Sequence, residues 1–345
     1  MKKNVGKKQK FYWIKYLIEV INFNSSKVIK EISLKNFPLS YKLEKTNIEN
    51  KLENHLINSV DRRTSNNFST YGVWLSGGLD SSIIAAILRE FTEEVYTFSV
   101  GFEGSPDLNS AKIVSKYLGT KHTVYELDVN ELFSSIPKVI YYLESFDAPL
   151  VRSSLGNAIV SKISSSADVV FSGEGGDELF AGYDYFLDLD SKKSMQRELL
   201  NSVNSLHNTA LQRVDRLANA YNVNIKLPIL DEALVNYSLQ ISPGKKVRKD
   251  KNISKYILRK VASNYLPDSI AWRKKDKFWE GSGIVDTISK RVDKIITNEE
   301  FRKSRKISKN FMLRNKEELY YYKTFKTFYP DLKIENILSL TQDFN

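Results

Sequence analysis

The chain has no cysteine and little histidine. Its 345 residues include three histidines, His55, His122 and His207, which lie far apart in the sequence. The absence of cysteine excludes disulfides, thiolate-bound metals and a cysteine nucleophile. Three isolated histidines also disfavour a histidine-rich metal site, because lone histidines are usually ordinary surface or core residues. A chain without cysteine is compatible with a reducing compartment, and we expect a cytoplasmic protein.

The sequence also lacks a segment suited to crossing a membrane. The most apolar early stretch, residues 11–23, contains Lys15 and Glu19. It is shorter than the roughly 20 residues that a spanning helix needs, and it lacks the small-residue cleavage site of a secretory signal. We therefore expect no association with membranes.

The chain is basic, with a formal net charge of +11 and a pI of about 9.3. Its lysines are spread along the sequence rather than gathered in one block. This distribution indicates a solvated surface that attracts anionic small-molecule substrates. It disfavours nucleic acid as a partner, and composition leaves open whether the chain forms a homo-oligomer.

Short apolar strands that alternate with amphipathic helices predict an α/β fold. The pattern predicts strands over residues 71–75, 95–100, 123–127 and 169–171, and helices over 47–60, from 80 onward, and over 108–118. Such alternation is typical of a parallel sheet with helices on both faces. After about residue 188 the periodicity is mainly helical, over 199–220, 232–239 and 254–264. We expect three parts: a short N-terminal tail (1–46), a core domain (47–285) and a helical C-terminal extension (286–345).

The first motif that carries chemistry is residues 76–82, which read Ser-Gly-Gly-Leu-Asp-Ser-Ser between a strand and a helix. Its glycines let the backbone turn sharply and approach a ligand, and its serines place hydroxyls and backbone N–H groups at a helix start, which suits pyrophosphate. Asp80 beside that site is a natural ligand for a Mg²⁺ that bridges phosphates. The structural alternative is a plain turn in which Asp80 caps the helix. The motif lacks the Gly-Lys-Ser/Thr ending of a P-loop.

The second motif is a glycine-rich turn with three acidic residues, which occupies residues 172–183 directly after the strand 169–171. A turn at the carboxyl end of a parallel strand faces the ligand crevice. Acids this close repel one another unless a cation balances them, so Asp177 is a second candidate for Mg²⁺. Glu174 can serve as an acid, a base or an orienting group. A solvated acidic loop is the alternative.

Together the two motifs resemble those of the synthetase domain of the asparagine synthetase family. Further similar segments follow in the same order at residues 100–102, 104–108, 119–122, 227–231 and 271–283. The likeness covers roughly residues 47–285. It implies a twisted parallel sheet of the adenine nucleotide alpha hydrolase-like type. In this fold a PP-loop binds the part of ATP that leaves as pyrophosphate. It also implies a ligase of asparagine biosynthesis that uses ATP and Mg²⁺ and forms AMP.

The resemblance implies a role for each matching residue. ATP would be bound by Leu75, Ser76, Gly77, Gly78, Asp80, Ser81, Val100, Ser172 and Gly173. Asp80 and Asp177 would hold Mg²⁺. Lys275 would place its charge against the α-phosphate, and Glu174 would pair with Lys275 or assist the attacking amine. Tyr183 and Asp231 would support the substrate site, although Asp231 could equally be a helix cap.

The sequence departs from the family pattern at two places. Lys226, Leu227 and Ile229 replace residues of an Arg-Val-Pro-Phe segment, which either alters the acceptor pocket or repacks a core. Glutamine-dependent members also carry an N-terminal glutaminase domain with a cysteine nucleophile, whereas this chain has about 46 residues before its predicted core and no cysteine. We therefore expect it to use free ammonia, ammonia from a separate glutaminase subunit, or another amine.

The expected reaction is adenylation of a carboxylate, with aspartate as the best candidate, followed by amide formation with ammonia and release of AMP and pyrophosphate. Three alternatives stay open. The first is a related enzyme that makes a lactam or modifies a peptide. The second is a tRNA-modifying enzyme on the same fold, and the third is an inactive nucleotide-binding partner.

Overall fold

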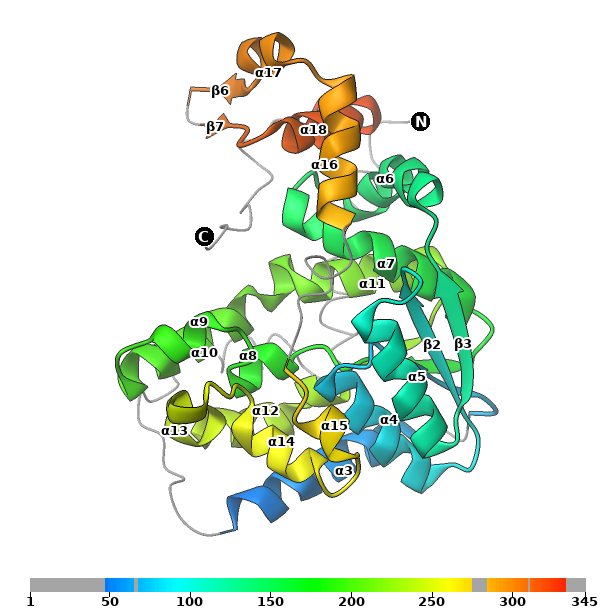
Figure 1. Cartoon of the computed structure of the whole chain (residues 1–345), viewed down its shortest axis with the longest axis vertical. Helices are drawn as coiled ribbons and strands as arrows, with labels where there is room; N and C mark the ends of the chain where they lie inside the picture. Colours follow the sequence, from blue (N-terminus) through cyan, green and yellow to red (C-terminus); the bar gives the residue numbers. More distant parts are fainter. Residues whose placement is uncertain (1–46, 65–67, 275–283, 310, 333–345) are drawn as a thin grey trace.

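The computed structural model describes residues 47–64, 68–274, 284–309 and 311–332 (Figure 1). The predicted N-terminal tail and Lys275 lie outside these ranges. None of the helices within them is long and apolar enough to span a bilayer.

The centre of the molecule is a five-stranded sheet in which every neighbouring pair is parallel. Its strands are β1 (Tyr71–Trp74), β2 (Val95–Gly101), β3 (Lys121–Glu126), β4 (Val169–Phe171) and β5 (Ile225–Lys226). Their order across the sheet is β3-β2-β1-β4-β5. The chain runs outward from β1 to β3 and then returns to β4 on the other side of β1. Ligands of open parallel sheets bind where the strand order reverses in this way, so the crevice is expected between the carboxyl ends of β1 and β4.

Helices cover both faces of this sheet. The longer ones in the core are α3 (Ile48–Thr64), α4 (Leu79–Phe91), α5 (Pro106–Leu118), α6 (Val129–Leu143), α7 (Ala148–Ser164), α10 (Lys192–Ser205), α11 (Ala210–Ala220), α12 (Glu232–Gln240) and α14 (Tyr256–Ala262). Shorter ones are α8 (Gly176–Phe180), α9 (Tyr185–Asp188), α13 (Pro243–Lys246) and α15 (Asp268–Ala271). The helices α4 and α5 follow successive strands and pack on one face, and α7 packs on the other together with α11 and α6. Every residue of β1 and β4 is buried, as expected for a sheet covered on both sides.

The C-terminal part stands on α6 and α7, at one end of the molecule (Figure 1). It contains α16 (Ile284–Ile295), α17 (Asn298–Ser304), α18 (Lys316–Phe328) and a small antiparallel pair, β6 (Lys306–Ser308) with β7 (Phe311–Met312). A second apolar core forms here, in which Tyr321 and Phe325 of α18 pack with Leu132 and Val139 of α6. The first core surrounds the sheet.

The predicted α/β class with a parallel sheet and helical additions is confirmed. Residues 199–220 form two helices rather than one, because the 3₁₀ turn Leu206–Asn208 separates α10 from α11. The two-residue strand β5 lies in a region predicted as helical, since two residues are too few to show a strand pattern. The helix predicted from residue 254 begins at Tyr256, because Lys255 has a φ of 53° and cannot continue a right-handed helix.

A buried lysine gives the fold a testable dependence on pH. Lys246, at the end of α13, is 0% exposed, and its Nζ has no hydrogen-bond partner among the described residues. Burial lowers the pKa of Lys246 to about 7. An unfolded lysine keeps its proton up to roughly pH 10. The unfolded chain therefore binds the extra proton between these values, and this lysine costs stability that is regained as the pH rises.

We predict that Lys246→Met raises the free energy of unfolding by about 4 kcal/mol at pH 6.5 and by about 1 kcal/mol at pH 9.5, since the charged form no longer has to be buried. Denaturant unfolding at the two pH values measures both gains. Lys245→Met, which alters the exposed neighbour, serves as the matched control. Equal gains in the free energy of unfolding at both pH values would contradict a buried Lys246 with a lowered pKa.

Candidate active site

The first motif forms a tight loop between β1 and α4. Gly77 has a φ of +71°, and a Cβ atom there would lie 2.5 Å from the backbone N of Ala111 and 2.6 Å from the carbonyl O of Asp107. The loop is thus pressed against α5, and glycine is required at this position. The backbone N–H of Ser76 donates to Oγ of Ser81 at 3.1 Å, and the two serine hydroxyls lie 3.0 Å apart. These bonds fix the shape of the proposed pyrophosphate loop.

The second motif packs directly on the first. A Cβ atom on Gly173 would lie 2.5 Å from the backbone N of Ser81, and one on Gly176 would lie 2.3 Å from Oδ1 of Asp80. The two glycines therefore allow the turn after β4 to touch the first turn of α4. The structure brings the two motifs together, as expected for turns that follow neighbouring parallel strands.

One buried lysine joins the two candidate metal ligands. Nζ of Lys255 lies 2.7 Å from Oδ1 of Asp177 and also forms an ion pair with Oδ2 of Asp80. The side chain of Lys255 is 4% exposed, against 17% for Asp80 and 20% for Asp177. Burial by itself would lower the pKa of Lys255, but the two carboxylates raise it above its ordinary value. The lysine is therefore a fixed cation between two anions.

The geometry around this lysine again depends on glycine. A Cβ atom on Gly182 would lie 2.0 Å from Oδ1 of Asp177 and 2.2 Å from Cε of Lys255. Sequence reasoning missed Lys255, because the lysines before α14 were interpreted as surface residues. The only local signal is its position between the apolar residues Ile253 and Ile257, at the predicted start of a helix.

The two carboxylates fit a magnesium ion. Both reach a single ammonium group, so they lie close enough to share one metal. Magnesium is usually held by one or two carboxylates together with substrate phosphates. In the ranges that the structure describes, no group of three or more histidine, cysteine, aspartate or glutamate side chains could hold a metal alone. The two carboxylates therefore suit a Mg²⁺ ion that is also bound by the phosphates of a ligand.

Glu174 is held by an arginine from another helix. Nη2 of Arg213, on α11, donates to Oε1 of Glu174 at 2.8 Å. Their side chains are 20% and 21% exposed. Burial opposes the charge of Arg213, but the attraction of Glu174 outweighs it and raises the pKa of the guanidinium. Sequence reasoning missed this arginine, and Lys275, the predicted partner of Glu174, lies outside the described residues.

Tyr183, the last residue of the second motif, packs back against it through a hydrogen bond to Glu178. Its hydroxyl donates to Oε1 of Glu178 at 2.6 Å. Burial, together with the neighbouring charge of Asp177, raises the pKa of Glu178 to about 7. Tyr183 is half-buried, and its ring stacks on that of Tyr185 at 5.7 Å. These contacts place Tyr183 within the scaffold of the turn that carries Asp177.

Asp231 links two helices. It accepts a hydrogen bond from the backbone N–H of Ala233 at 3.1 Å and so caps α12. It also binds Nη2 of Arg62 at 2.5 Å and Nη1 of Arg63 at 3.0 Å, both on α3. Burial alone would raise the pKa of Asp231, but these hydrogen bonds lower it. Both the cap and a supporting ionic contact are present at this position.

The remaining predicted ATP-binding residues lie at the carboxyl edge of the sheet. The backbone N–H of Leu75 donates to the carbonyl of Phe98 at 2.9 Å, just beyond β1. The backbone N–H of Ser172 donates to the carbonyl of Lys226 at 2.9 Å, just beyond β4. Val100 lies half-buried near the end of β2. The structure thus gathers these residues along one edge, next to the two motifs.

Solved structures with a related outline include the NH3-dependent NAD synthetase of Campylobacter jejuni, with 17% identity and a TM-score of 0.32. That match covers 50% of this chain and 93% of the other. The NMN synthetase of Francisella tularensis matches with 12% identity and a TM-score of 0.33, over 86% of this chain and 99% of the other. TM-scores this low carry no argument about fold or function.

Sequence comparison is more informative. The pea (Pisum sativum) root asparagine synthetase [glutamine-hydrolyzing] is 34% identical over 280 residues, which cover 75% of this chain and 48% of the relative. Asparagine synthetase B [glutamine-hydrolyzing] of Escherichia coli K12 is 31% identical over 301 residues, covering 82% and 53%. This chain spans about half the length of these relatives. The family model for asparagine synthase matches residues 51–195 and 187–334, which is most of the chain. The chain therefore belongs to the asparagine synthase family.

Proposed function

We propose that this chain is an ATP-dependent carbon–nitrogen ligase that adenylates a carboxylate and then converts the adenylate to an amide. The observation that carries the proposal is the convergence of Asp80 and Asp177 on one cation beside the loop of Ser76 and Ser81. These groups can hold the phosphates of ATP and a metal at the switch point of the sheet. Membership of the asparagine synthase family supports the same chemistry.

In the first step a carboxylate oxygen of the acceptor attacks the α-phosphorus of ATP. A new O–P bond forms, the bond to the β-phosphate bridge breaks, and pyrophosphate leaves. Ser76, Gly78 and Ser81 would hold the leaving phosphates through hydroxyl and backbone N–H groups. A bound Mg²⁺, held by Asp80 and Asp177, would neutralise charge on the phosphates. Lys275, which the structure does not describe, would act on the α-phosphate as the family resemblance implies.

In the second step an amine attacks the acyl carbon, and AMP leaves as the amide forms. Glu174 is the candidate residue for orienting this amine and accepting its proton. Arg213 would act as a positioning residue, because it fixes one carboxylate oxygen of Glu174. Different groups of side chains would thus serve the two half-reactions.

For the substrates, we propose aspartate as the acceptor and ammonia as the amine. The family supports aspartate over a lactam-forming, peptide-modifying or tRNA-modifying activity. Because the 345 residues contain no cysteine, they supply no cysteine nucleophile for glutamine hydrolysis. Free ammonia or a separate glutaminase subunit would supply the amine. A cytoplasmic location and a homo-oligomer stay predictions.

We further propose the division into residues 47–285 and a C-terminal extension from 286. The strands β6 and β7 of the extension form a sheet of their own, which supports this division. The helix α16 nevertheless spans the boundary, and one apolar core joins α18 to α6 and α7. The family model also runs to residue 334, so the extension belongs to the family's common structure.

Exchange of labelled pyrophosphate into ATP tests the proposed adenylation directly. We expect exchange that depends on aspartate and on Mg²⁺ in a panel of carboxylic acids, because the first step is reversible. Asp80→Asn should lower it by a factor of about 100 or more, as expected when a group that stabilises transferring phosphates is lost. Asp61→Asn, on the exposed side of α3, is the matched control. If another carboxylic acid drives the exchange, that acid replaces aspartate as the proposed acceptor. Exchange with no acid at all would overturn the proposal.

Because Lys255 forms ion pairs with both proposed metal ligands, we predict that a variant without this lysine is stabilised more strongly by Mg²⁺ than the parent is. Lys255→Met leaves Asp80 and Asp177 close together without their shared cation, which should cost about 3 kcal/mol of stability in the metal-free protein. Added Mg²⁺ should recover part of this loss, so the variant's melting temperature should rise more with Mg²⁺ than the parent's. Lys260→Met, which removes an exposed lysine paired with Glu49, is the control. Equal responses of variant and parent to Mg²⁺ would contradict a metal site at these carboxylates.

The pairing of Arg213 with Glu174 predicts a variant that separates the two half-reactions. Arg213→Met should retain pyrophosphate exchange but form amide about tenfold more slowly, the equivalent of losing one charge-assisted hydrogen bond. Arg213→Lys should recover part of the amide formation. Both rates are measured on the same preparation by exchange and by product analysis. A parallel fall of both rates would assign Arg213 a general structural role instead.

A further inference from the structure

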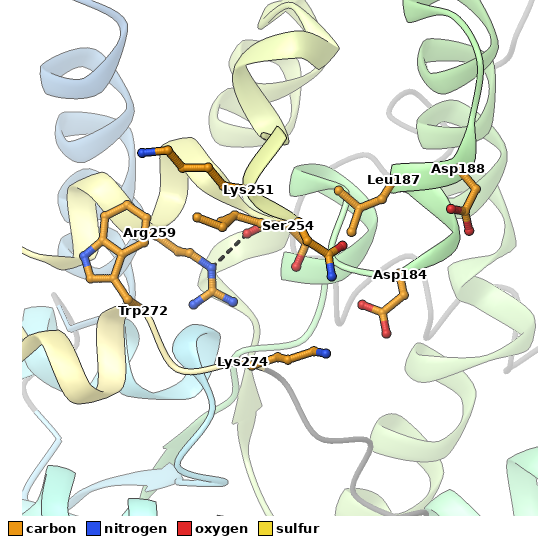
Figure 2. A pocket seen from close by; sticks show the side chains of 10 residues that line it. Asp184, Leu187, Asp188, Lys251, Ser254, Arg259, Trp272 and Lys274 are labelled. Atoms are coloured by element: carbon orange, nitrogen blue, oxygen red, sulfur yellow. Dashed lines mark hydrogen bonds between the residues drawn. The ribbon is translucent and has the colours of Figure 1, made fainter. Parts of the chain in front are cut away.

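A cavity of about 410 Å³ lies between the segment around α9 and the segments before and after α14 (Figure 2). It is bounded on one side by Asp184 and Asp188, from the segment that contains α9. On the other side lie Ser254, Arg259 and Lys274. Its volume is in the range of small-molecule sites. The two sides carry charges of opposite sign.

On both sides of the cavity, a lining residue is a near neighbour in the sequence of a residue that contacts the two proposed metal ligands. Ser254 directly precedes Lys255, whose ammonium group contacts Asp80 and Asp177. On the opposite side, Asp184 comes two residues after Gly182, whose Cα lies against Asp177 and Lys255. Segments that line the cavity therefore also carry groups that contact the two carboxylates.

Arg259 gives the cavity a fixed cation. Its side chain is buried, with the residue 5% exposed, and Nε donates to the carbonyl of Ser254 at 2.8 Å. Nη1 donates to the carbonyls of Ala271 and Arg273 at 2.8 and 2.9 Å. Within the described part of the chain these bonds use Nε and Nη1, so Nη2 is left for another acceptor. Figure 2 shows the guanidinium between Trp272 and Ser254.

The charges of the two proposed metal ligands also act on the guanidinium of Arg259. Burial lowers the pKa of Arg259, and the charges of Asp80 and Asp177 act in the opposite direction. The group therefore lies within electrostatic range of both carboxylates. Figure 2 shows the side chain of Lys274 extending below Arg259 toward the side where Asp184 lies.

The acidic and basic sides of the cavity together indicate which charges its ligand carries. A bare anion would meet Asp184 and Asp188, and a bare cation would meet Arg259 and Lys274. A metal-chelated polyphosphate satisfies both sides, because its oxygens accept hydrogen bonds from the basic groups. Its hydrated metal faces the carboxylates, as Mg²⁺ keeps several of its waters when bound.

We propose that this cavity is a second site, which receives magnesium pyrophosphate after adenylation and is distinct from the loop that binds ATP. The proposal rests on the proposed function, since it takes pyrophosphate as the product of the first step. Occupation of the cavity moves the product away from the adenylate. The reverse attack of pyrophosphate on the adenylate then becomes slower than attack by the amine.

The test is calorimetric titration of magnesium pyrophosphate into the full chain, with the ATP site saturated by magnesium α,β-methylene-ATP. We expect about one further equivalent to bind. Lys274→Ala should weaken this binding about tenfold, the equivalent of one charge-assisted hydrogen bond. Lys303→Ala, which removes an exposed lysine of α17, should bind as the parent does. No binding beside the analogue, or equal binding by Lys274→Ala and the parent, would overturn the proposal.

A second variant separates magnesium pyrophosphate from a general anion site. Asp188→Asn removes a carboxylate that would face the metal, so it should weaken binding of magnesium pyrophosphate severalfold. At a site for simple anions the same change would strengthen binding, and that result would overturn the assignment. Equally tight binding of inorganic phosphate would do the same. Failure of the parent to bind the ATP analogue or to catalyse exchange would instead contradict the proposed function.

Discussion

The ion pairs of Lys255 with Asp80 and Asp177 are the contact on which the site depends. Two carboxylates this close repel each other in a partly buried environment, and one of them would take up a proton without a cation beside it. The lysine removes that repulsion and fixes three separate segments: the loop after β1, the turn after β4 and the start of α14. The glycines at positions 176 and 182 follow from this contact, because a side chain at either would occupy the space of the charged groups.

Local features of the site could be predicted from the sequence, and features that depend on distant packing could not. The loop at Gly77 and the acidic turn at Asp177 were predicted, because glycines and carboxylates at fixed spacing after an apolar strand carry their own signal. Their proximity followed from the parallel arrangement of the strands. Lys255 and Arg213 were not predicted, since each is a single basic residue, one just before α14 and one on α11, whose acidic partners lie far away in the sequence. The strand β5 was missed because its position is set by pairing with β4 rather than by its own pattern.

The C-terminal part connects to the same site through α7 and α11. Nε of Arg152, on α7, donates to Oε1 of Glu317 on α18 at 2.7 Å, and the hydroxyl of Tyr321 donates to the same oxygen at 2.6 Å. Breaking such a buried ionic contact by removing one partner is costly, because the other charge stays buried. Since α7 packs against α11, which carries Arg213, the C-terminal helices support the segment that positions Glu174. The second core is therefore part of the framework that holds Arg213 and Glu174, the residues proposed for the amide-forming step.

The proposed chemistry is one in which a carboxylate oxygen becomes bonded to the α-phosphorus of ATP. The most direct measurement is the fate of oxygen-18 supplied in the carboxylate of the acceptor. Formation of an acyl-adenylate places one labelled oxygen in AMP when the amine displaces it, and none in the pyrophosphate. Mass spectrometry of the released nucleotide should therefore show AMP heavier by one label. Unlabelled AMP, or label in inorganic phosphate together with release of ADP, would contradict adenylation at this site.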